Sequence, residues 1–393
     1  MRTQVAIIGA GPAGTLLSHL LHLEGIDSII LESRSYEYCT TRVRAGLLEQ
    51  NSVDLLNEVG LADRLNTVAL PHDGVQFTFD GGCHRIDMQE LTGRRVTIYA
   101  QQEIVKDIVN VRQRDGGTIL FEAAATKITG LEDKPVITFT HEGEEKTLEC
   151  DYIAGCDGFH GISRDSMPDS VKQGFDRVYP FGWLGMLIAA VPPSEELIYS
   201  HSDDGFALFS MRGPALTRAY LQVRPDDHVD NWPEERIWKE LRGRLGQHEG
   251  LEINEGEIMQ PAITAMRSYV SEPMQYGKLF LAGDSAHIVP PTGAKGMNLA
   301  IADVCVLSRA FIDFYKNNKT HYFDTYTETC LKRVWRAEHF SWWMTTMLHP
   351  PYDANPFDLR RQIAELHTVL GSQAGCTLIA ENYAGLPIVP WRP

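Results

Sequence analysis

The alternation of apolar and polar residues predicts a strand, turn, helix, strand unit at the start of the chain. Residues 4–8 are almost continuously apolar, as in a parallel strand that is covered on both faces. A glycine-rich turn follows, and then a helix over residues 13–25, where a glycine supplies the stop. A second apolar strand, residues 28–31, ends on Glu32. This order is typical of a Rossmann-like unit.

Later segments predict a sheet-rich region and then helices. Residues 74–100 and 136–156 read as short strands separated by turn residues, and residues 178–225 are again strand-rich. Hairpin turns are indicated by Asp203-Asp204-Gly205 and by Gly213-Pro214, and the pattern is mostly helical after Asp284. We therefore expect an α/β chain: a Rossmann-like domain of sequence-distant pieces, an inserted sheet-rich domain and a helical carboxyl-terminal region.

Composition narrows the classes of function. The chain has 393 residues and a formal net charge of −16, which argues against a nucleic-acid partner because phosphates demand a basic surface. No stretch of eighteen apolar residues and no signal-peptide pattern is found. We expect a cytoplasmic protein without a membrane partner. An anionic small substrate stays compatible, since one arginine in a pocket outweighs distant charge.

Cysteine spacing argues against a metal site. The seven cysteines are odd in number and form no CxxC pair. This suits reduced, mostly buried thiols better than a disulfide framework or a zinc site.

Three glycine-containing turns indicate a dinucleotide. Gly9, Gly11 and Gly14 lie between the first strand and helix, where backbone amides and the helix dipole favour a pyrophosphate. Glu32, at the end of the second strand, is placed to hold ribose hydroxyls. Asp157, before Gly158, and Asp284, after Gly283, each follow another apolar strand. The first turn alone leaves NAD and FAD open.

Four longer runs carry a specific resemblance. Together with the three turns, residues 151–164, 178–185, 287–296 and 381–387 resemble the class A flavoprotein aromatic hydroxylases, and within them the hydroxylases of 4-hydroxybenzoate. The similarity spans nearly the whole chain. It implies an FAD-dependent monooxygenase that uses NADPH, with NADH as the alternative, and O2 to form 3,4-dihydroxybenzoate through a flavin C4a-hydroperoxide. It also implies a homodimer.

The resemblance implies a division of the chain. The FAD-binding domain is expected from residues 1–73, 99–177 and 273–345. The substrate domain is expected from residues 74–98 and 178–272, with residues 346–393 as a helical dimer region. By the same resemblance, FAD is contacted by Ala13, Glu32, Arg42, Val43, Arg44, Ala45, Gly46, Leu47, Gln101, Asp284 and Met297. Arg44 is expected at the pyrophosphate, since a guanidinium gives a two-pronged grip on phosphate.

A carboxylate cradle is indicated by strand periodicity as well as by the resemblance. Period-two alternation places Ser210 and Arg212 on one face of a strand, and the following turn lets Tyr220 approach from the next strand. Met211 belongs to the same substrate-binding segment. If Arg212 faces inward, we expect an anion beside it, because a buried guanidinium without a partner destabilises the fold.

The roles of the residues expected at the phenol end of the substrate are implied by the resemblance alone. It implies that Tyr199 and Tyr383 form a hydrogen-bond chain that removes the phenol proton, with His72 as the outlet to solvent and the Pro291 carbonyl beside the phenol oxygen. Lys295 and Asn298 are implied to stabilise negative charge on the reduced flavin.

Nicotinamide contacts are implied at Tyr38, His160 and Arg267. Arg34 is placed to pair with the 2′-phosphate of NADPH, whereas Glu37 would repel it.

Other functions stay open at this level. Met297 and Ala100 differ from the residues associated with the family and leave room for an amino- or dihydroxybenzoate substrate. An NAD-dependent dehydrogenase or a nucleotide-sensing regulator would lack the element at Gly283-Asp284. A flavin halogenase is disfavoured because its Trp-x-Trp-x-Ile-Pro motif is missing.

Overall fold

The computed structural model describes residues 1–42, 46–245 and 251–393, and within them the first sheet is assembled from distant parts of the chain. Its strands run in the order β17-β18-β11-β1-β2-β8, with β10 on β11 and β9 on β10. Their bounds are β1 (Arg2–Ile8), β2 (Ser28–Leu31), β8 (Thr118–Leu120), β9 (Ala124–Thr129), β10 (Val136–His141), β11 (Glu144–Gly155), β17 (Gln275–Tyr276) and β18 (Leu279–Leu281).

The centre of this sheet confirms the predicted βαβ unit. β1 pairs in parallel with β2 on one side and with β11 on the other. α1 (Pro12–Leu23) begins with proline at its first position, which has no amide hydrogen to leave unpaired, and Gly25 after its end has a φ of +70°. α6 (Gln101–Arg114) and α8 (Gly296–Asn317) pack against α1.

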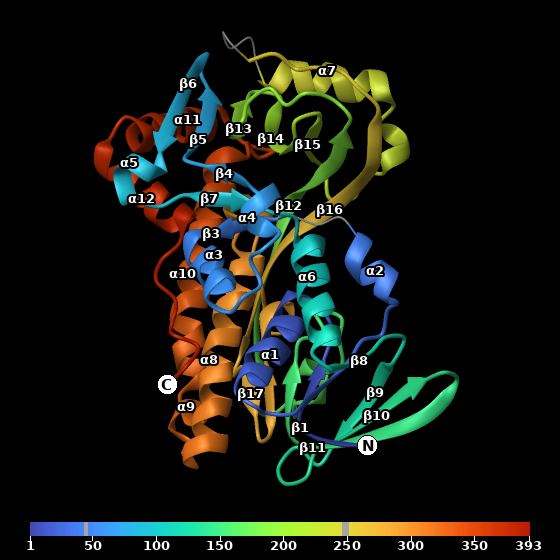
Figure 1. Cartoon of the computed structure of the whole chain (residues 1–393). Helices are drawn as coiled ribbons and strands as arrows, with labels where there is room; N and C mark the ends of the chain where they lie inside the picture. The colour runs from blue at the N-terminus through green and yellow to red at the C-terminus, as the bar shows by residue number, and fades with distance from the viewer. Residues whose placement is uncertain (43–45, 246–250) are drawn as a thin grey trace.

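A second sheet forms the upper part of the molecule (Figure 1). Its strands run in the order β19-β16-β12-β15-β14-β13-β5-β6. Their bounds are β5 (Gly74–Phe79), β6 (Gly82–Asp87), β12 (Gln173–Ile188), β13 (Leu197–Ser202), β14 (Gly205–Gly213), β15 (Leu216–Val223), β16 (Ile258–Glu272) and β19 (His287–Ile288). The long strands β12 and β16 pair with each other and run from the first sheet into the second. Both predicted hairpin turns lie in this sheet, at β13–β14 and β14–β15.

Between the sheets lies a small antiparallel sheet, β3-β7-β4, made of β3 (Leu47–Glu49), β4 (Leu70–His72) and β7 (Val96–Ile98). Short helices border it and the nucleotide-binding part: α2 (Tyr36–Thr41), α3 (Gln50–Glu58), α4 (Leu65–Val68) and α5 (Met88–Thr92). α7 (Glu234–Leu245) covers the far side of the second sheet.

Helices dominate the chain after Asp284, as predicted. α8 and α10 (Tyr326–Leu348) pack together along one side, with the short α9 (His321–Asp324) between them in sequence. α11 (Pro356–Leu370) and α12 (Gln373–Ala384) then return to the second sheet, where α12 packs on α5. The carboxyl-terminal helices therefore reach the second sheet. The predicted α/β class is confirmed, and the exact domain boundaries stay a prediction.

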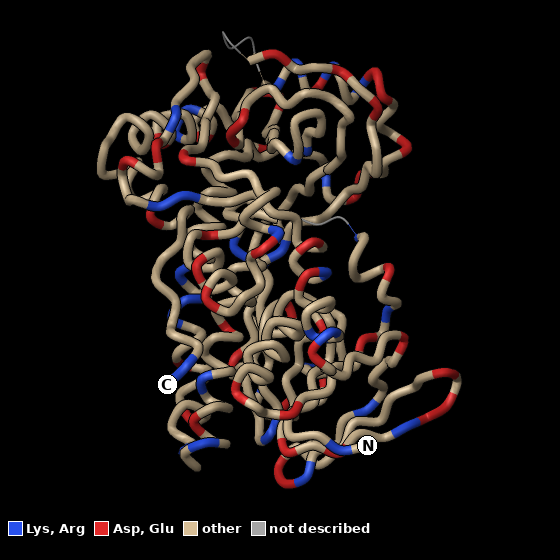
Figure 2. Tube along the Cα trace, viewed as in Figure 1, with Lys and Arg blue, Asp and Glu red and all other residues tan. Residues whose placement is uncertain are grey.

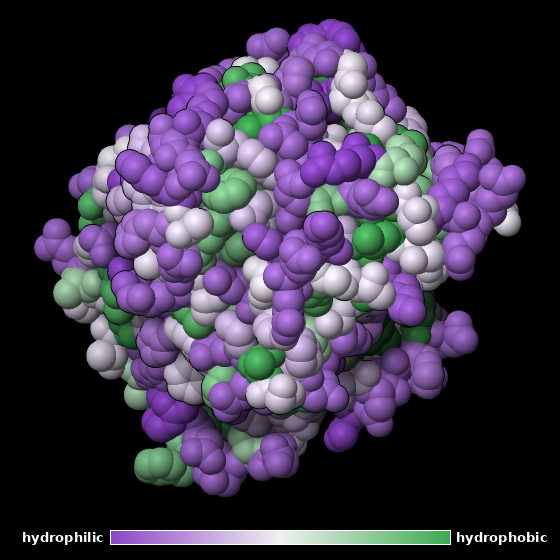
Figure 3. Space-filling model, turned by 90° about the horizontal axis from the view of Figure 1, so that it is seen from below, coloured by the Kyte–Doolittle hydropathy of each residue, from purple (hydrophilic) through white to green (hydrophobic). Residues whose placement is uncertain are grey.

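Surface features are those of an acidic protein. Asp and Glu are spread over both parts of the molecule (Figure 2). On the face seen in Figure 3, polar residues dominate and apolar residues occur as scattered spots. Among the described helices, none combines the length and apolar character of a membrane span. All seven cysteines are free thiols.

Candidate active site

The first glycine turn leaves one side open to a ligand. A Cβ at Gly9 would overlap the Cys156 carbonyl, and one at Gly14 would overlap the Gly9 carbonyl, so both glycines are needed for close packing. A Cβ at Gly11 would meet nothing within 4 Å. Glu32 is buried at this turn, and its carboxylate accepts from Ala10 N at 2.7 Å and from Arg34 N at 2.8 Å. The turn thus fits the approach of a pyrophosphate, with an acid beside it.

The other two predicted turns, at Asp157-Gly158 and Gly283-Asp284, lie next to this glycine turn. β11 ends beside β1, and the Asp157 carboxylate accepts from the Ser163 amide and hydroxyl, both at 2.9 Å. β18 pairs with β11, and Gly283 N donates to the buried Asp303 at 2.9 Å. Asp303 also contacts His287 Nε2 at 2.6 Å. Three carboxyl ends of parallel strands therefore face one region, the usual place for a ligand in such a sheet.

Of the residues expected around FAD, Val43, Arg44 and Ala45 lie outside the described residues. Arg42 is exposed, and its guanidinium contacts the Tyr38 hydroxyl. Gly46 packs directly on the backbone of Tyr99 and Ala100, where a Cβ would collide. The remaining positions lie near the starts of elements: Ala13 in α1, Leu47 in β3, Gln101 in α6 and Met297 in α8, with Asp284 in the Gly283–Ser285 turn.

Arg212 is a half-buried cation with two shielded, unpaired nitrogens. Its Nε and Nη1 atoms are shielded from solvent and have no hydrogen-bond partner. Burial lowers the pKa of its guanidinium, which still carries its charge. Ser210 is buried two residues earlier on β14. An anion is the ligand that would satisfy this site.

Strand pairing brings Tyr220 and one further residue onto the face that carries Ser210. Tyr220 lies opposite Leu208, and Arg218 lies opposite Ser210, so their side chains share the face of Ser210. The Arg218 guanidinium lies 4.9 Å from the Tyr220 ring centre, and its Nε is also buried without a partner. Sequence reasoning missed Arg218, although the same alternation indicated it. Met211, between the two cradle residues, is half-buried at a shift in register.

Tyr199 and Tyr383 meet in the core. Their hydroxyl oxygens are 2.7 Å apart, although the residues come from β13 and α12. The Tyr199 hydroxyl also donates to the Thr292 carbonyl at 2.5 Å. Thr292 belongs to the Pro291–Gly293 turn. The expected place of the Pro291 carbonyl, beside the phenol oxygen of a substrate, stays a prediction. Burial raises the pKa of both phenols, so both are neutral.

His72 is buried at the end of β4, with neither ring nitrogen hydrogen-bonded. Burial lowers its pKa to about 4. The ring is therefore neutral near pH 7.

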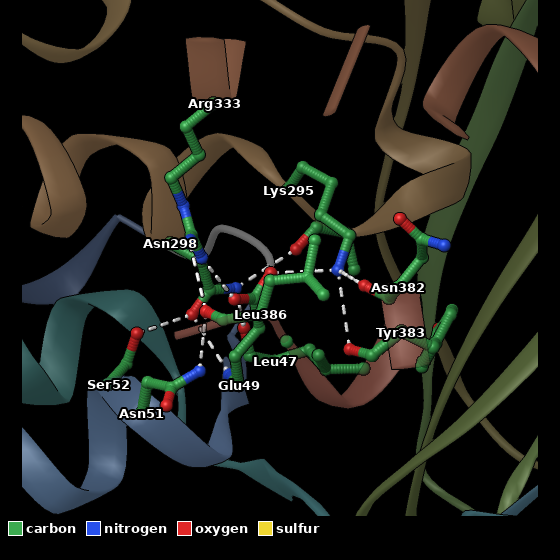
Figure 4. A network of polar contacts seen from close by, with 12 residues as sticks. Leu47, Glu49, Asn51, Ser52, Lys295, Asn298, Arg333, Asn382, Tyr383 and Leu386 are labelled. Carbon is green, nitrogen blue, oxygen red and sulfur yellow. Dashed lines mark hydrogen bonds and ion pairs between the residues drawn. The ribbon is translucent and has the colours of Figure 1, made fainter. Parts of the chain in front are cut away.

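Lys295 and Asn298 belong to a buried polar network at the start of α8 (Figure 4). Lys295 Nζ contacts Glu49 Oε1 at 2.8 Å and the Asn382 and Tyr383 carbonyls. Burial lowers the pKa of Lys295, with Glu49 acting against that effect. The Asn298 amide nitrogen donates to the Leu47 and Ala294 carbonyls, and its oxygen accepts from Glu49 N and Ser52.

The nicotinamide candidates form two surface clusters. In the first, the guanidinium carbons of Arg34 and Arg42 each lie 5.3 Å from the Tyr38 ring centre. In the second, the His160 ring centre is 5.1 Å from that of Phe159, and the Arg267 guanidinium carbon is 4.6 Å from the Phe159 ring. Arg267 is held by Asp176 through a hydrogen bond of 2.7 Å.

Comparisons with known proteins agree with this geometry. A family model described as an FAD binding domain matches residues 2–341. The p-hydroxybenzoate hydroxylase of Acinetobacter baylyi is 48% identical over 388 residues, which cover 98% of this chain and 96% of the relative.

The chain belongs to the FAD-binding family of p-hydroxybenzoate hydroxylase.

Other members of the family are more distant. A 3-(3-hydroxy-phenyl)propionate/3-hydroxycinnamic acid hydroxylase of Escherichia coli is 23% identical over 76% of this chain and 54% of its own length. Among solved structures, p-nitrophenol 4-monooxygenase from Pseudomonas putida has a TM-score of 0.82 at 17% identity, covering 98% of this chain and 100% of that one. A flavin-dependent halogenase has a TM-score of 0.75 at 19% identity, covering 96% of this chain and 76% of that one. These structures show the shared fold.

Proposed function

We infer that this chain is an FAD-dependent monooxygenase that converts 4-hydroxybenzoate, NADPH, a proton and O2 into 3,4-dihydroxybenzoate, NADP+ and water. The observation that carries the inference is a pair of polar groups on one face of the second sheet. Arg212, with two shielded and unpaired nitrogens, suits a carboxylate, and the joined phenols of Tyr199 and Tyr383 suit a phenol. The A. baylyi relative, at 48% identity, carries the name of that activity.

Geometry along the sheet supports a substrate of this kind. Tyr199, Leu208 and Tyr220 lie opposite one another on β13, β14 and β15, so the two tyrosines are separated by two strand spacings, about 10 Å. Their side chains share one face. A single aromatic ring with polar groups at opposite ends fits between such anchors.

Bound FAD supplies the redox chemistry, accepting hydride from the nicotinamide and activating O2. The chain's own residues do the rest. Arg212, Ser210 and Tyr220 hold the carboxylate and so fix the orientation of the ring. Tyr199 accepts the phenol proton while it passes its own proton to Tyr383, which makes the substrate ring electron-rich, and His72 is the proposed outlet for the proton. All three residues are buried, which shields this end of the substrate from bulk water.

Roles around the cofactor are part of the same proposal. Glu32 and the turn at Gly9, Gly11 and Gly14 hold the dinucleotide. Lys295 and Asn298, at the positive end of α8, stabilise negative charge on the bound flavin. The Phe159–Arg267 cluster receives the nicotinamide, and Arg34 favours NADPH through its 2′-phosphate.

Assembly and location are also proposed rather than measured. Trp335, Trp342 and Phe357 are exposed on α10 and α11, and large exposed aromatics are typical of a protein interface. We propose a cytoplasmic homodimer that uses this helical region. Light scattering of the holoenzyme tests the dimer, and a monomer at micromolar concentration contradicts it.

Uncoupling tests the role of Tyr199. In the Tyr199→Phe variant, NADPH oxidation with 4-hydroxybenzoate should continue, while 3,4-dihydroxybenzoate formed per NADPH falls at least about tenfold, because the proton is no longer removed. Product and NADPH are measured together, with NADH and with amino- and dihydroxybenzoates as comparisons.

A matched control is Tyr326→Phe. Tyr326 is also fully buried, and its hydroxyl also donates to a carbonyl, that of Leu281, at 2.7 Å. This control should keep the wild-type coupling. Full product yield from Tyr199→Phe would remove Tyr199 from the proposed role, and no product from the wild type with 4-hydroxybenzoate would contradict the proposed substrate.

A further inference from the structure

The Tyr199 hydroxyl has a single proton, and a backbone carbonyl accepts it. Its oxygen lies 2.5 Å from the Thr292 carbonyl oxygen and 2.7 Å from the Tyr383 hydroxyl. A carbonyl can only accept a hydrogen bond, so Tyr199 donates to Thr292. The hydrogen bond between the two phenols is therefore donated by Tyr383 to Tyr199.

This orientation is the reverse of the one that proton removal needs. A bound phenol can pass its proton to Tyr199 only while Tyr199 passes its own proton to Tyr383, which in turn releases one toward water. Once a phenolate has formed, Tyr199 must donate to the phenolate. Both steps require the Tyr199 proton to leave the Thr292 carbonyl.

We propose that the Thr292 carbonyl locks the tyrosine pair until a bound phenolic substrate loses its proton, and that Thr345 is the positioning residue for this lock. Release breaks one hydrogen bond, from Tyr199 to Thr292, and forms one, from Tyr199 to the substrate oxygen. No covalent bond changes in this exchange. The inference rests on the proposed function, because it needs a phenolic substrate.

Thr345 ties the turn that carries the lock to α10. The Thr345 hydroxyl lies 2.9 Å from the Thr292 hydroxyl, and it donates to the Ser341 carbonyl at 2.6 Å. Both threonines are fully buried. At Gly293 a Cβ would collide with Ser341, so the turn lies flat on the helix. Because a buried hydroxyl without a partner is costly, loss of the Thr345 hydroxyl should displace the turn.

The adjacent threonine is a natural control. The Thr346 hydroxyl bonds the Trp342 and Trp343 carbonyls of its own helix, both at 3.1 Å. A Thr346→Val variant therefore removes the same kind of hydroxyl from α10 without touching the turn.

Crystal structures of the holoenzyme with and without 4-hydroxybenzoate test the lock directly. The distance from the Tyr199 hydroxyl to the Thr292 carbonyl should exceed 3.5 Å when the substrate is bound as the phenolate, at a pH above its pKa in the complex, and stay below 3 Å in its absence. A contact that persists unchanged beside a bound phenolate overturns the lock.

The pKa of the bound phenol tests Thr345. It is read from the ultraviolet absorbance of the phenolate in the holoenzyme complex as the pH is varied. A weaker lock competes less for the Tyr199 proton, so Thr345→Val should lower the phenol pKa by roughly 0.5 to 1, the effect of one ordinary hydrogen bond. Thr345→Ser, which keeps the hydroxyl, and Thr346→Val should both match the wild type.

An unchanged or raised phenol pKa in Thr345→Val overturns the positioning role, as does the same shift in Thr345→Ser. If Thr345 only stabilised the fold, Thr345→Val would lower the melting temperature and would not change the phenol pKa. Failure of the wild type to hydroxylate 4-hydroxybenzoate would contradict the proposed function. A hydroxylating wild type whose Tyr199–Thr292 contact never changes would contradict the lock.

Discussion

At the scale of single residues, Arg212 shows how one buried charge indicates the chemistry of a ligand. Its Nε and Nη1 atoms are shielded from water and unpaired, and shielding part of a charge without a partner destabilises a fold. The same atoms favour the binding of a carboxylate, because charge-assisted hydrogen bonds are about twice as strong as neutral ones. The unpaired charge therefore lowers the stability of the ligand-free protein and makes the site specific for a ligand with a carboxylate.

The Arg212→Met variant should separate these two effects. We expect it to weaken 4-hydroxybenzoate binding by about a hundredfold, through the loss of charge-assisted hydrogen bonds. The ligand-free variant should melt at or above the wild-type temperature, because an unpaired charge is gone. Substrate titration and thermal unfolding measure the two effects. Arg224→Met, at an exposed residue just beyond β15, is the control, and wild-type affinity in Arg212→Met would refute the cradle.

At the scale of elements, the end of α10 connects both ends of the pocket. His349 Nε2 accepts from the Trp183 indole at 2.7 Å, so Nδ1 carries the ring proton and donates to the Thr345 carbonyl at 2.8 Å. Trp183 in turn lies against the cradle residue Tyr220, with ring centres 4.7 Å apart. One helix terminus thus supports the carboxylate end through His349 and the phenol end through Thr345.

His349 should make the fold sensitive to acid. Burial lowers its pKa to about 3, against an ordinary value of 6.5. Between these two pH values the unfolded chain binds a proton at His349 that the folded chain does not bind. The free energy of unfolding is therefore undiminished above pH 6.5 and decreases as the pH falls below it. His349→Gln, which keeps an acceptor for Trp183, should reduce this slope between pH 6.5 and 4 in urea titrations. His339→Gln, at an exposed residue of the same helix, is the control, and equal slopes in wild type and His349→Gln would contradict the account.

At the scale of the whole molecule, one buried carboxylate joins parts of the chain that are far apart in sequence. Glu49 on β3 contacts Lys295 at the start of α8 and Arg333 on α10, both at 2.8 Å. Arg333 also donates to the Leu386 and Pro387 carbonyls, behind α12. This network fixes the segment that carries Tyr383 against the nucleotide-binding domain.

Breaking this network should lower the stability of the folded protein. Arg333→Met leaves Glu49 with one cation and should lower the free energy of unfolding by about 2 to 3 kcal/mol, somewhat less than for a fully buried pair because Arg333 is partly exposed. Lys332→Met removes the neighbouring cation, which forms an exposed pair with Glu328, and should cost at most about 0.5 kcal/mol. Chemical denaturation of both variants measures the difference, and similar values would show that the network adds little.

Much of the fold follows from local patterns. The βαβ start, both hairpins of the second sheet and the helical end depend on periodicity, glycine and proline, which act over a few residues. The same alternation placed Ser210 and Arg212 on one face of β14 and brought Tyr220 beside them. It also places Arg218 there, opposite Ser210.

Contacts across long stretches of chain have no such local signal. Thr292 meets Tyr199 and Thr345, and Lys295 meets Glu49, only because distant elements pack together. The amino-acid pattern determines which side chains share a strand face, since that follows from a period of two. Which carbonyl accepts the Tyr199 proton depends on how a turn, a strand and two helices fit into one core, and that is settled by packing over the whole molecule.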